Sequence, residues 1–248
     1  MTPARSSPWT LSAETATLKT PGLEASLSVN VPAQGLASLR WQGKELAGWR
    51  ILQILAPNAE GQQPLSVQDS YVRGADLVAS YRADEAGQRQ PHIYWRLVEQ
   101  SSRGAAGVQM IVSAQTSLLD SDPQLICISD FACDEILCHD GQESFQMLKA
   151  SDRKEVAVSS AYLVRPKGAD FSFLEMIHPT DFAGARVRPA SGTPNGWQSQ
   201  WQLFPERLEK GVIRRARLAA WFVPRTGDVE ASSAVFQQFI AEPPPLTT

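Results

Sequence analysis

Residues 23–30 read Leu-Glu-Ala-Ser-Leu-Ser-Val-Asn, a strict alternation of apolar and polar side chains. Successive side chains of a β-strand point to opposite faces of a sheet, so this period of two predicts a strand with one buried face. Similar patterns recur along the chain and are interrupted by turn-forming residues, for example at 42–43 and 166–168.

Other segments carry comparable strand signals, and one segment carries a helical signal. Residues 229–241 have apolar side chains near helical spacing, with Asp228 expected as the N-cap and prolines 243–245 ending the helix. A short turn is expected near residues 130–137. The further expected strands are residues 35–41, 76–82, 92–99, 107–115, 155–164, 170–177, 181–187, 197–204 and 212–223.

The number of strands determines the expected fold class. About a dozen strands, with a turn every ~8–12 residues, predict an all-β fold, a large antiparallel sandwich or barrel with a short C-terminal helix. No convincing linker divides the chain, so residues 1–248 are expected to form a single domain.

Composition excludes several classes of protein. The chain is 43% hydrophobic and 20% charged, which is ordinary for a globular domain. Its net charge of −3 lacks the strong positive balance of a nucleic-acid-binding protein. No apolar run is long enough for a membrane helix or the core of a signal peptide, so we expect a cytoplasmic protein without a membrane partner.

The three cysteines, Cys127, Cys133 and Cys138, fall within one short stretch. Their odd number and their spacing argue against a disulfide scaffold and favour reduced thiols in or near a core. His139 beside Cys138 leaves zinc as an alternative, but the paired spacing and four ligands of structural zinc sites are missing. We therefore expect no metal and no cofactor.

Familiar catalytic signatures such as Gly-x-Ser-x-Gly and the Walker loop are absent, so candidate sites come from polar rows on strands. His92, Tyr94 and Arg96 share one face of their expected strand, and the apolar residues between them face the core. Such a row could orient a polyhydroxylated or anionic ligand. The alternative is an ordinary solvated face of an antiparallel sheet.

Tyr71 and Arg73 form a second polar row, next to Gly74, which permits a bulge or a close backbone approach. If this segment lay beside the strand of His92, the two rows would combine into one polar patch. The alternative is the polar end of an ordinary strand.

A third group follows later in the chain. Arg215 and Arg217 share a face of their expected strand, and Glu206 and Glu209 precede it. A carboxylate in an arginine-lined groove would stay ionised and could act as a general base. The alternative is a structural cluster of ion pairs.

Trp197 and Trp201 lie four residues apart, on one face of an expected strand. Exposed tryptophans on a sheet can stack on sugar rings, whereas the burial habits of tryptophan favour a pair that faces the core.

The opening stretch, residues 23–48 with Gly-Lys-Glu-Leu at 43–46, resembles the start of the aldose 1-epimerase, or galactose mutarotase-like, group. This resemblance implies a large β-supersandwich. It also implies proton transfer by histidines and a late glutamate, which open and reclose a sugar ring. By position along the chain, rather than by motif, the resemblance makes His92 the candidate acid and Glu209 the candidate base.

Together these observations favour a carbohydrate-binding or carbohydrate-modifying protein, and if it is an enzyme, an epimerase-like isomerase. The arginines favour an acidic or phosphorylated sugar, because guanidinium groups bind such groups bidentately. The alternative is a non-catalytic β-sandwich that binds a partner protein, and the oligomeric state is open. The expected substrate-binding residues are Tyr71, Arg73, Tyr94, Arg96 and Arg215, with His92 and Glu209 as catalytic residues.

Overall fold

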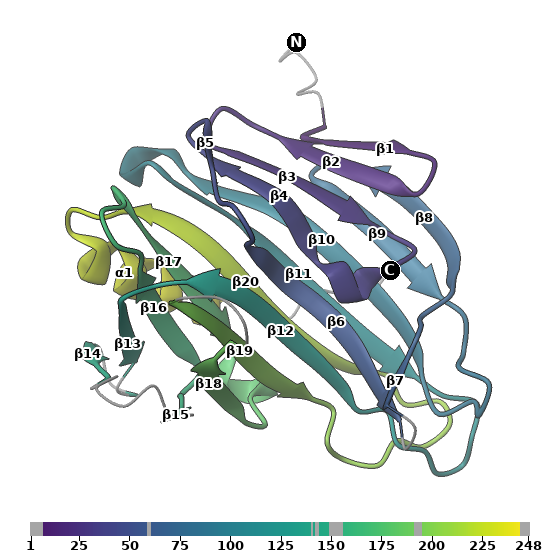
Figure 1. Cartoon of the computed structure of the whole chain (residues 1–248). Helices are drawn as coiled ribbons and strands as arrows, with labels where there is room; N and C mark the ends of the chain where they lie inside the picture. The colour runs from purple at the N-terminus through teal and green to yellow at the C-terminus, as the bar shows by residue number, and fades with distance from the viewer. Residues whose placement is uncertain are drawn as a thin grey trace.

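The computed structural model describes residues 7–58, 61–139, 141, 144–148, 156–190 and 195–243. Two antiparallel sheets lie face to face and form a sandwich, as Figure 1 shows. The α-helix of the described residues, α1 (Asp228–Ala241), packs on the outer face of one sheet. This architecture confirms the predicted all-β sandwich with a C-terminal helix.

The first sheet contains eleven strands of the described chain, and all neighbouring strands are antiparallel. Its central strands are the long β6 and β12, which pair with each other. In order across the sheet lie β1 (Trp9–Ser12), β2 (Thr15–Lys19), β3 (Leu23–Ser28), β4 (Leu36–Trp41), β6 (Arg50–Asn58), β12 (Leu125–Ala132), β19 (Gly196–Leu203), β18 (Ala185–Pro189) and β15 (Val156–Ala157), with β5 (Lys44–Glu45) beside β4 and β7 (Gly61–Gln63) beside β6.

The second sheet contains nine strands of the described chain, again antiparallel throughout. Its centre is formed by β20, β11 and β10, which are eleven residues long each. In order lie β14 (Phe145–Met147), β13 (Glu135–His139), β16 (Ala161–Arg165), β17 (Phe171–Ile177), β20 (Arg214–Pro224), β11 (Ala105–Gln115), β10 (Gln90–Gln100), β9 (Asp76–Tyr81) and β8 (Val67–Arg73).

The main core lies between the two sheets and follows the alternation of the strands. In β3, Leu23, Ala25 and Leu27 are buried, and the polar residues between them are only half-buried. The centre is aromatic, since Trp41 of the first sheet stacks on Phe222 of the second with 5.4 Å between the ring centroids. The period of two therefore predicted the buried face of β3 correctly.

Helix α1 covers part of the outer face of the nine-stranded sheet. Val235 and Phe236 belong to a second apolar cluster with Trp221 of the sheet. The N-cap of the helix is Gly227, in a left-handed conformation, and not Asp228 as the sequence predicted. The carboxylate of Asp228 instead accepts hydrogen bonds from side chains of the sheet, so it anchors the helix rather than capping it.

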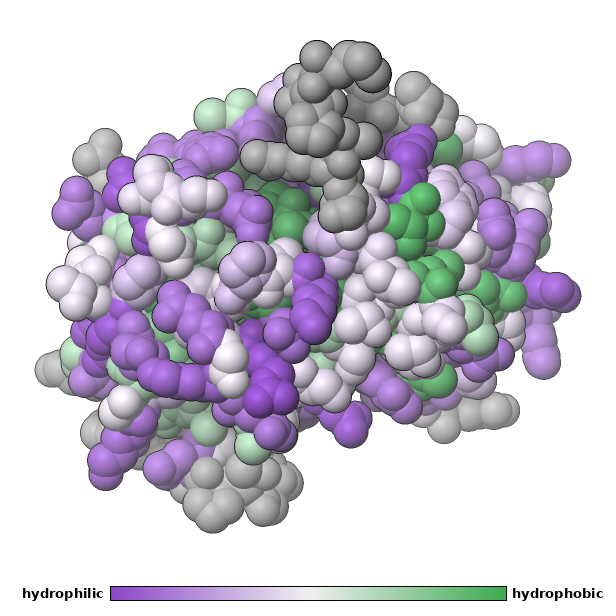
Figure 2. Space-filling model, turned by 90° about the horizontal axis from the view of Figure 1, so that it is seen from above, coloured by the Kyte–Doolittle hydropathy of each residue, from purple (hydrophilic) through white to green (hydrophobic). Residues whose placement is uncertain are grey.

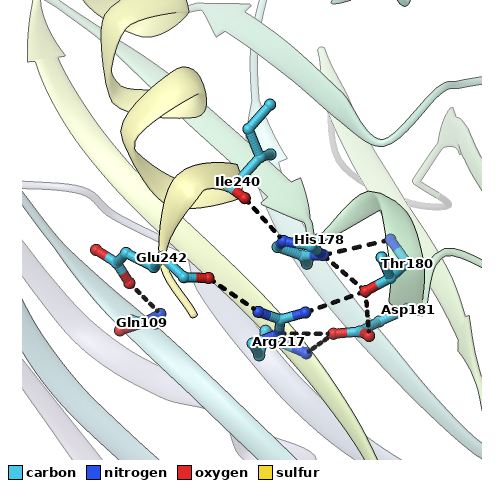
Figure 3. Close-up of polar contacts among 7 residues, drawn as sticks. All are labelled: Gln109, His178, Thr180, Asp181, Arg217, Ile240 and Glu242. Carbon is cyan, nitrogen blue, oxygen red and sulfur yellow. Dashed lines mark hydrogen bonds and ion pairs between the residues drawn. The ribbon is translucent and has the colours of Figure 1, made fainter. Parts of the chain in front are cut away.

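Polar contacts fix the C-terminal end of α1 to the same sheet (Figure 3). His178 Nε2 lies 3.2 Å from the carbonyl oxygen of Ile240, and Arg217 Nη1 donates a hydrogen bond to the carbonyl oxygen of Glu242. Arg217 also forms an ion pair with Asp181, with 3.0 Å between Nε and Oδ2. Carbonyl groups at the end of a helix have no partner within the helix, and these side chains supply donors for them.

Two expected elements differ from the structure. The strand expected at 181–187 begins only at Ala185, because Pro179–Asp181 form a 3₁₀ turn, η3. His178 stabilises this turn by accepting a hydrogen bond from the backbone N–H of Thr180. The other 3₁₀ turns in the described part of the chain are η1 (Pro32–Gln34) and η2 (Ser101–Arg103).

The turn expected near residues 130–137 is confined to Cys133 and Asp134, which connect the end of β12 to the start of β13 in the other sheet. Strand β12 pairs with a neighbour on each side, so hydrogen bonds on both edges keep it extended. The strand expected at 155–164 divides into β15 and β16, and residue 155 lies outside the described residues.

The face of the molecule seen in Figure 2 is mostly hydrophilic or neutral, and its hydrophobic residues lie mainly toward the right of the view. Among the described residues, no helix is long and apolar enough to cross a bilayer.

Candidate functional site

A cleft of about 570 Å³ lies on the eleven-stranded sheet, at one end of β6, β12, β19 and β18. Its polar side chains are Arg50, Asp130, Gln198 and Arg188, and we call it the polar cleft. Its volume falls within the roughly 300–1,000 Å³ that small-molecule sites in proteins occupy. The aromatic residues among its lining are Trp49, Phe131 and Trp197.

The register of the strands brings the four polar side chains into one row. Arg50 of β6 pairs with Asp130 of β12, which pairs with Gln198 of β19, which pairs with Arg188 of β18. Residues opposite one another in antiparallel strands share a face, so the four side chains project from the same face of the sheet.

Hydrogen bonds connect three members of this row. The guanidinium of Arg188 donates to Gln198 Oε1 from Nη2 at 2.7 Å and from Nε at 3.2 Å. Gln198 Nε2 donates to Asp130 Oδ1 at 2.9 Å, and Gln53 Nε2 donates to Asp130 Oδ2 at 2.8 Å. The carboxylate of Asp130 is thus held by two amides rather than by an arginine.

Arg50 differs from the other members of the row. Its side chain is exposed, and its guanidinium makes no hydrogen bond or ion pair with a residue that the structure describes. With Arg188, which is also exposed, it places two guanidinium groups against the one carboxylate of Asp130. The charged side chains of the polar cleft therefore favour a ligand with negative charge.

Large aromatic residues support the polar cleft from the core. Trp49 packs on Phe131 with 5.9 Å between ring centroids and on Phe173 with 5.4 Å. Trp197 and Trp201 are both buried, which confirms the core-facing alternative for this pair. Trp197 also belongs to the residues that line the cleft, where β19 begins.

A β-bulge in β6 separates Arg50 from Gln53. The register of β6 against β12 shifts here, so that Ile51 and Leu52 both lie opposite Ser129. Leu52 has a φ of 54°, a left-handed value that is rare for a residue with a side chain. Its backbone N–H donates to Ser129 Oγ at 2.9 Å, which replaces the hydrogen bond that the bulge removes from the ladder.

The predicted site lies elsewhere, on the outer face of the nine-stranded sheet. The register confirms that the two predicted rows share one face, with β9 between them: Tyr71 and Tyr94 both pair with Val78, and Arg73 and Arg96 both pair with Asp76. His92 is in line with Arg215 through Ser113 of β11.

The predicted site residues on this face have different surroundings. Arg96 binds Asp76 bidentately, at 2.7 and 2.9 Å, and this hydrogen-bonded carboxylate raises the pKa of the guanidinium. Partial burial lowers the pKa of His92. Tyr71 is exposed. The binding and catalytic roles assigned to this face stay predictions.

Glu209, the predicted catalytic base, lies outside both sheets. It is exposed and lies in the segment between β19 and β20, outside both strands. Its neighbour Glu206 forms an exposed ion pair with Arg214, at 3.3 Å, as the structural alternative for this segment suggested. Neither Glu209 nor His92 is part of the polar cleft.

The remaining histidines and the cysteines serve the core and the helix. His139 is buried between the rings of Phe145 and Phe236, and His178 supports the end of α1. Burial raises the pKa of the Cys138 thiol to about 12. Within the described ranges, no group of three or more histidine, cysteine, aspartate or glutamate side chains could hold a metal ion.

A sequence pattern could have pointed to two of the four polar residues of the cleft. Gln198 and Arg188 stand at alternating polar positions of two strands, the same pattern that pointed to His92 and Tyr94. Arg50 and Asp130 had no such signal, because the segment around Asp130 was expected to be a turn and the bulge interrupts the alternation of β6.

Comparison with solved structures identifies the class of the fold. The sandwich is the galactose mutarotase-like, or aldose 1-epimerase, supersandwich, which confirms the resemblance of residues 23–48. No family model matches the sequence, and no curated protein matches it by sequence comparison.

Three structures show the range of proteins that share this fold. An Escherichia coli K12 protein with a suspected aldose 1-epimerase activity has a TM-score of 0.57 at 8% identity, covering 84% of this chain and 98% of its own. A galactose mutarotase-like protein from Lactobacillus casei has a TM-score of 0.56 at 11% identity, covering 84% and 99%.

The third structure is the α-N-acetylgalactosaminidase NagBb of Bifidobacterium bifidum, solved in complex with GalNAc. Its TM-score is 0.57 at 11% identity, and the match covers 94% of this chain but only 38% of the glycosidase. At such identities the likeness shows the fold and does not assign a function.

Proposed function

We propose that this protein binds a carbohydrate in the polar cleft. The observation that carries the proposal is the row of Arg50, Asp130, Gln198 and Arg188, which the strand register aligns along the polar cleft. Guanidinium and amide groups donate hydrogen bonds, and the carboxylate accepts them, so together they match the hydroxyl groups of a sugar. The fold supports this, since it occurs in sugar-related proteins and in a glycosidase solved with GalNAc.

The ligand that fits best is an acidic or phosphorylated sugar. Arg50 has an exposed guanidinium without a partner among the described residues, and carboxylates and phosphates bind such a group bidentately. Gln198 and Asp130 would then hold the hydroxyl groups of the ring. In this geometry Asp130 is the carboxylate of the cleft, and an epimerase-like proton transfer would use it as the base.

A ligand panel on matched variants tests the proposal. Thermal unfolding is followed with galactose, galacturonate and galactose 6-phosphate at about 10 mM, above the ~1 mM upper end of typical substrate constants. A sugar with a Kd near 0.1 mM would stabilise the wild type by about 2.7 kcal/mol and raise Tm by roughly 5–10 °C.

Arg50→Ala and Arg96→Ala form the matched pair of this experiment. Both remove an exposed arginine from a strand, but only Arg50 lines the polar cleft. We expect the shift with an acidic sugar to vanish in Arg50→Ala and to persist in Arg96→Ala. Loss in Arg96→Ala alone would move the site to the nine-stranded sheet. No shift with any sugar would contradict carbohydrate binding and favour the partner-protein alternative.

A further inference from the structure

A carboxylic acid lies in the middle of the sandwich. Glu175 belongs to β17, but its side chain points toward the other sheet and is 0% exposed. Ser129 Oγ donates to its Oε1 at 2.5 Å, Ser199 Oγ donates to its Oε2 at 2.8 Å, and the hydroxyl of Tyr162 also donates to Oε2. Burial of a carboxyl group is unfavourable unless such partners are present, so the group is supported by a built network.

The two serines belong to the strands that form the polar cleft. Ser129 directly precedes Asp130 in β12, and Ser199 directly follows Gln198 in β19. Because side chains alternate along a strand, each serine points into the core where its neighbour points into the cleft. Glu175 therefore holds, from the opposite sheet, the two strands that carry Asp130 and Gln198.

A third connection leads to Arg50. Ser129 Oγ accepts the N–H of Leu52 at the bulge while it donates to Glu175, so a continuous chain of hydrogen bonds joins β6 to the buried carboxyl group. The bulge separates Arg50 from Gln53, whose amide holds Asp130. A left-handed residue such as Leu52 persists only where its surroundings determine its conformation.

We propose that Glu175 is the positioning residue of the polar cleft: it holds the β6 bulge through Ser129 and strand β19 through Ser199, and thereby the side chains that bind the ligand. It touches no ligand itself. The effect on binding rests on the proposed function, whereas the effect on the bulge does not.

The ionised form of Glu175 suits this network best. As a carboxylate, Glu175 accepts one hydrogen from each of the hydroxyl groups of Ser129, Ser199 and Tyr162. Protonation of Glu175 places a fourth hydrogen among these three contacts, so one hydrogen is left without an acceptor. Burial raises the pKa of Glu175 to about 7, the serine hydrogen bonds oppose this, and the charge of Asp130 adds to it. A further titratable neighbour, Cys127, stays a neutral thiol because burial and Glu175 both raise its pKa. The hydrogen bonds by which Glu175 holds the strands of the polar cleft should therefore weaken as the pH falls through about 7.

Hydrogen exchange at the Leu52 amide tests the proposal without any ligand. Glu175→Gln and Ser129→Ala are compared with the wild type at pH 8. The control is Ser172→Ala, which removes a buried hydroxyl from the same strand β17, but on the side of α1. We expect exchange at Leu52 to be roughly tenfold faster or more in the first two variants and unchanged in the control. Unchanged exchange in Ser129→Ala or Glu175→Gln overturns the proposal.

Titration with galacturonate, whose charge is constant from pH 6 to 8, tests the consequence for binding. We expect the Kd of the wild type to rise roughly tenfold on going from pH 8 to 6, and Glu175→Gln to bind weakly at both values. Equal affinity of Glu175→Gln and wild type overturns the positioning role. If galacturonate binds no form of the protein while the Leu52 amide responds, the proposed sugar fails and the support of the bulge by Glu175 stands.

Discussion

Arg165 holds Asp228 bidentately, with 2.8 Å between Nε and Oδ2 and 2.8 Å between Nη2 and Oδ1. Arg165 comes from β16 and Asp228 from the first turn of α1, so this ion pair attaches the helix to the outer face of the nine-stranded sheet. Ser172 Oγ donates a further hydrogen bond to Asp228.

Truncation of Arg165 should destabilise the protein strongly. The side chain of Asp228 is only 4% exposed, so Arg165→Ala leaves a buried charge without its partner and should lower the free energy of unfolding by about 3–5 kcal/mol. The control is Lys44→Ala, which breaks an exposed pair with Asp170 and should change it by about 1 kcal/mol or less. Urea denaturation measures both, and equal effects would contradict this role of Arg165.

The ion pair between Arg165 and Asp228 should make the free energy of unfolding decrease at acidic pH. Burial alone would raise the pKa of Asp228, but the hydrogen bonds from Arg165 and Ser172 outweigh it and hold the pKa below its ordinary value. The contribution of the pair is therefore present above a pH of about 4 and lost as the pH falls through the lowered pKa. Urea denaturation between pH 5 and 2.5 should show a smaller loss of stability in Arg165→Ala than in the wild type, and parallel curves would disprove the link.

Glu175 should give the opposite pH dependence for global stability, because ionising a fully buried carboxyl group costs desolvation even though the carboxylate completes the hydrogen bonds that hold the bulge. Its pKa is raised from an ordinary 4.5 to about 7, so the folded protein binds a proton that the unfolded chain releases. Stability should fall as the pH rises from about 4.5 to 7, by about 3 kcal/mol for this group. The difference in unfolding free energy between wild type and Glu175→Gln should change by about 2 kcal/mol between pH 5 and pH 7.5, whereas a constant difference would show that Glu175 does not titrate in this range.

Gly35 should be irreplaceable where it meets the β6 bulge. A Cβ at this position would lie 2.9 Å from the backbone nitrogen of Gln53 and would also clash with the carbonyl oxygen of Ile51. Gly35→Ala adds this overpacking, about 1–3 kcal/mol, to the strain of a left-handed alanine, about 1 kcal/mol. Gly43→Ala is the control, since Gly43 is also left-handed but has no neighbour within 4 Å. Thermal unfolding should rank Gly35→Ala below Gly43→Ala, and the reverse order would refute the close approach.

Ser232 offers a stabilising substitution. It is fully buried in α1, and its hydroxyl has no hydrogen-bond partner among the described residues. Ser232→Ala removes this unsatisfied group and improves helix propensity, so it should raise the free energy of unfolding by about 1 kcal/mol. A loss of stability in urea denaturation would mean that the hydroxyl has a partner in solution.

Strict alternation made the buried faces of some strands predictable from the sequence, whereas β12 and the bulged β6 were not predicted as strands. β3 and β10 alternate strictly, and their buried faces were assigned correctly. β12 lies in the middle of its sheet and carries Ile126 and Ile128 on the face away from the core, so its alternation is weak and its end was expected to be a turn. The bulge at Leu52 interrupts the alternation of β6 in the same way.

Alternation within single strands determined, from the sequence alone, that His92, Tyr94 and Arg96 share a face and that a β-sandwich forms, because the period of side chains along a strand is a local property. Only the tertiary structure decided which rows meet. Arg50, Asp130 and Gln198 come from strands far apart in the chain and align through register with one another and with Arg188 of the strand before Gln198, and Glu175 reaches Ser129 from the opposite sheet. Register and sheet packing depend on the whole set of long-range contacts, so no local pattern encodes them.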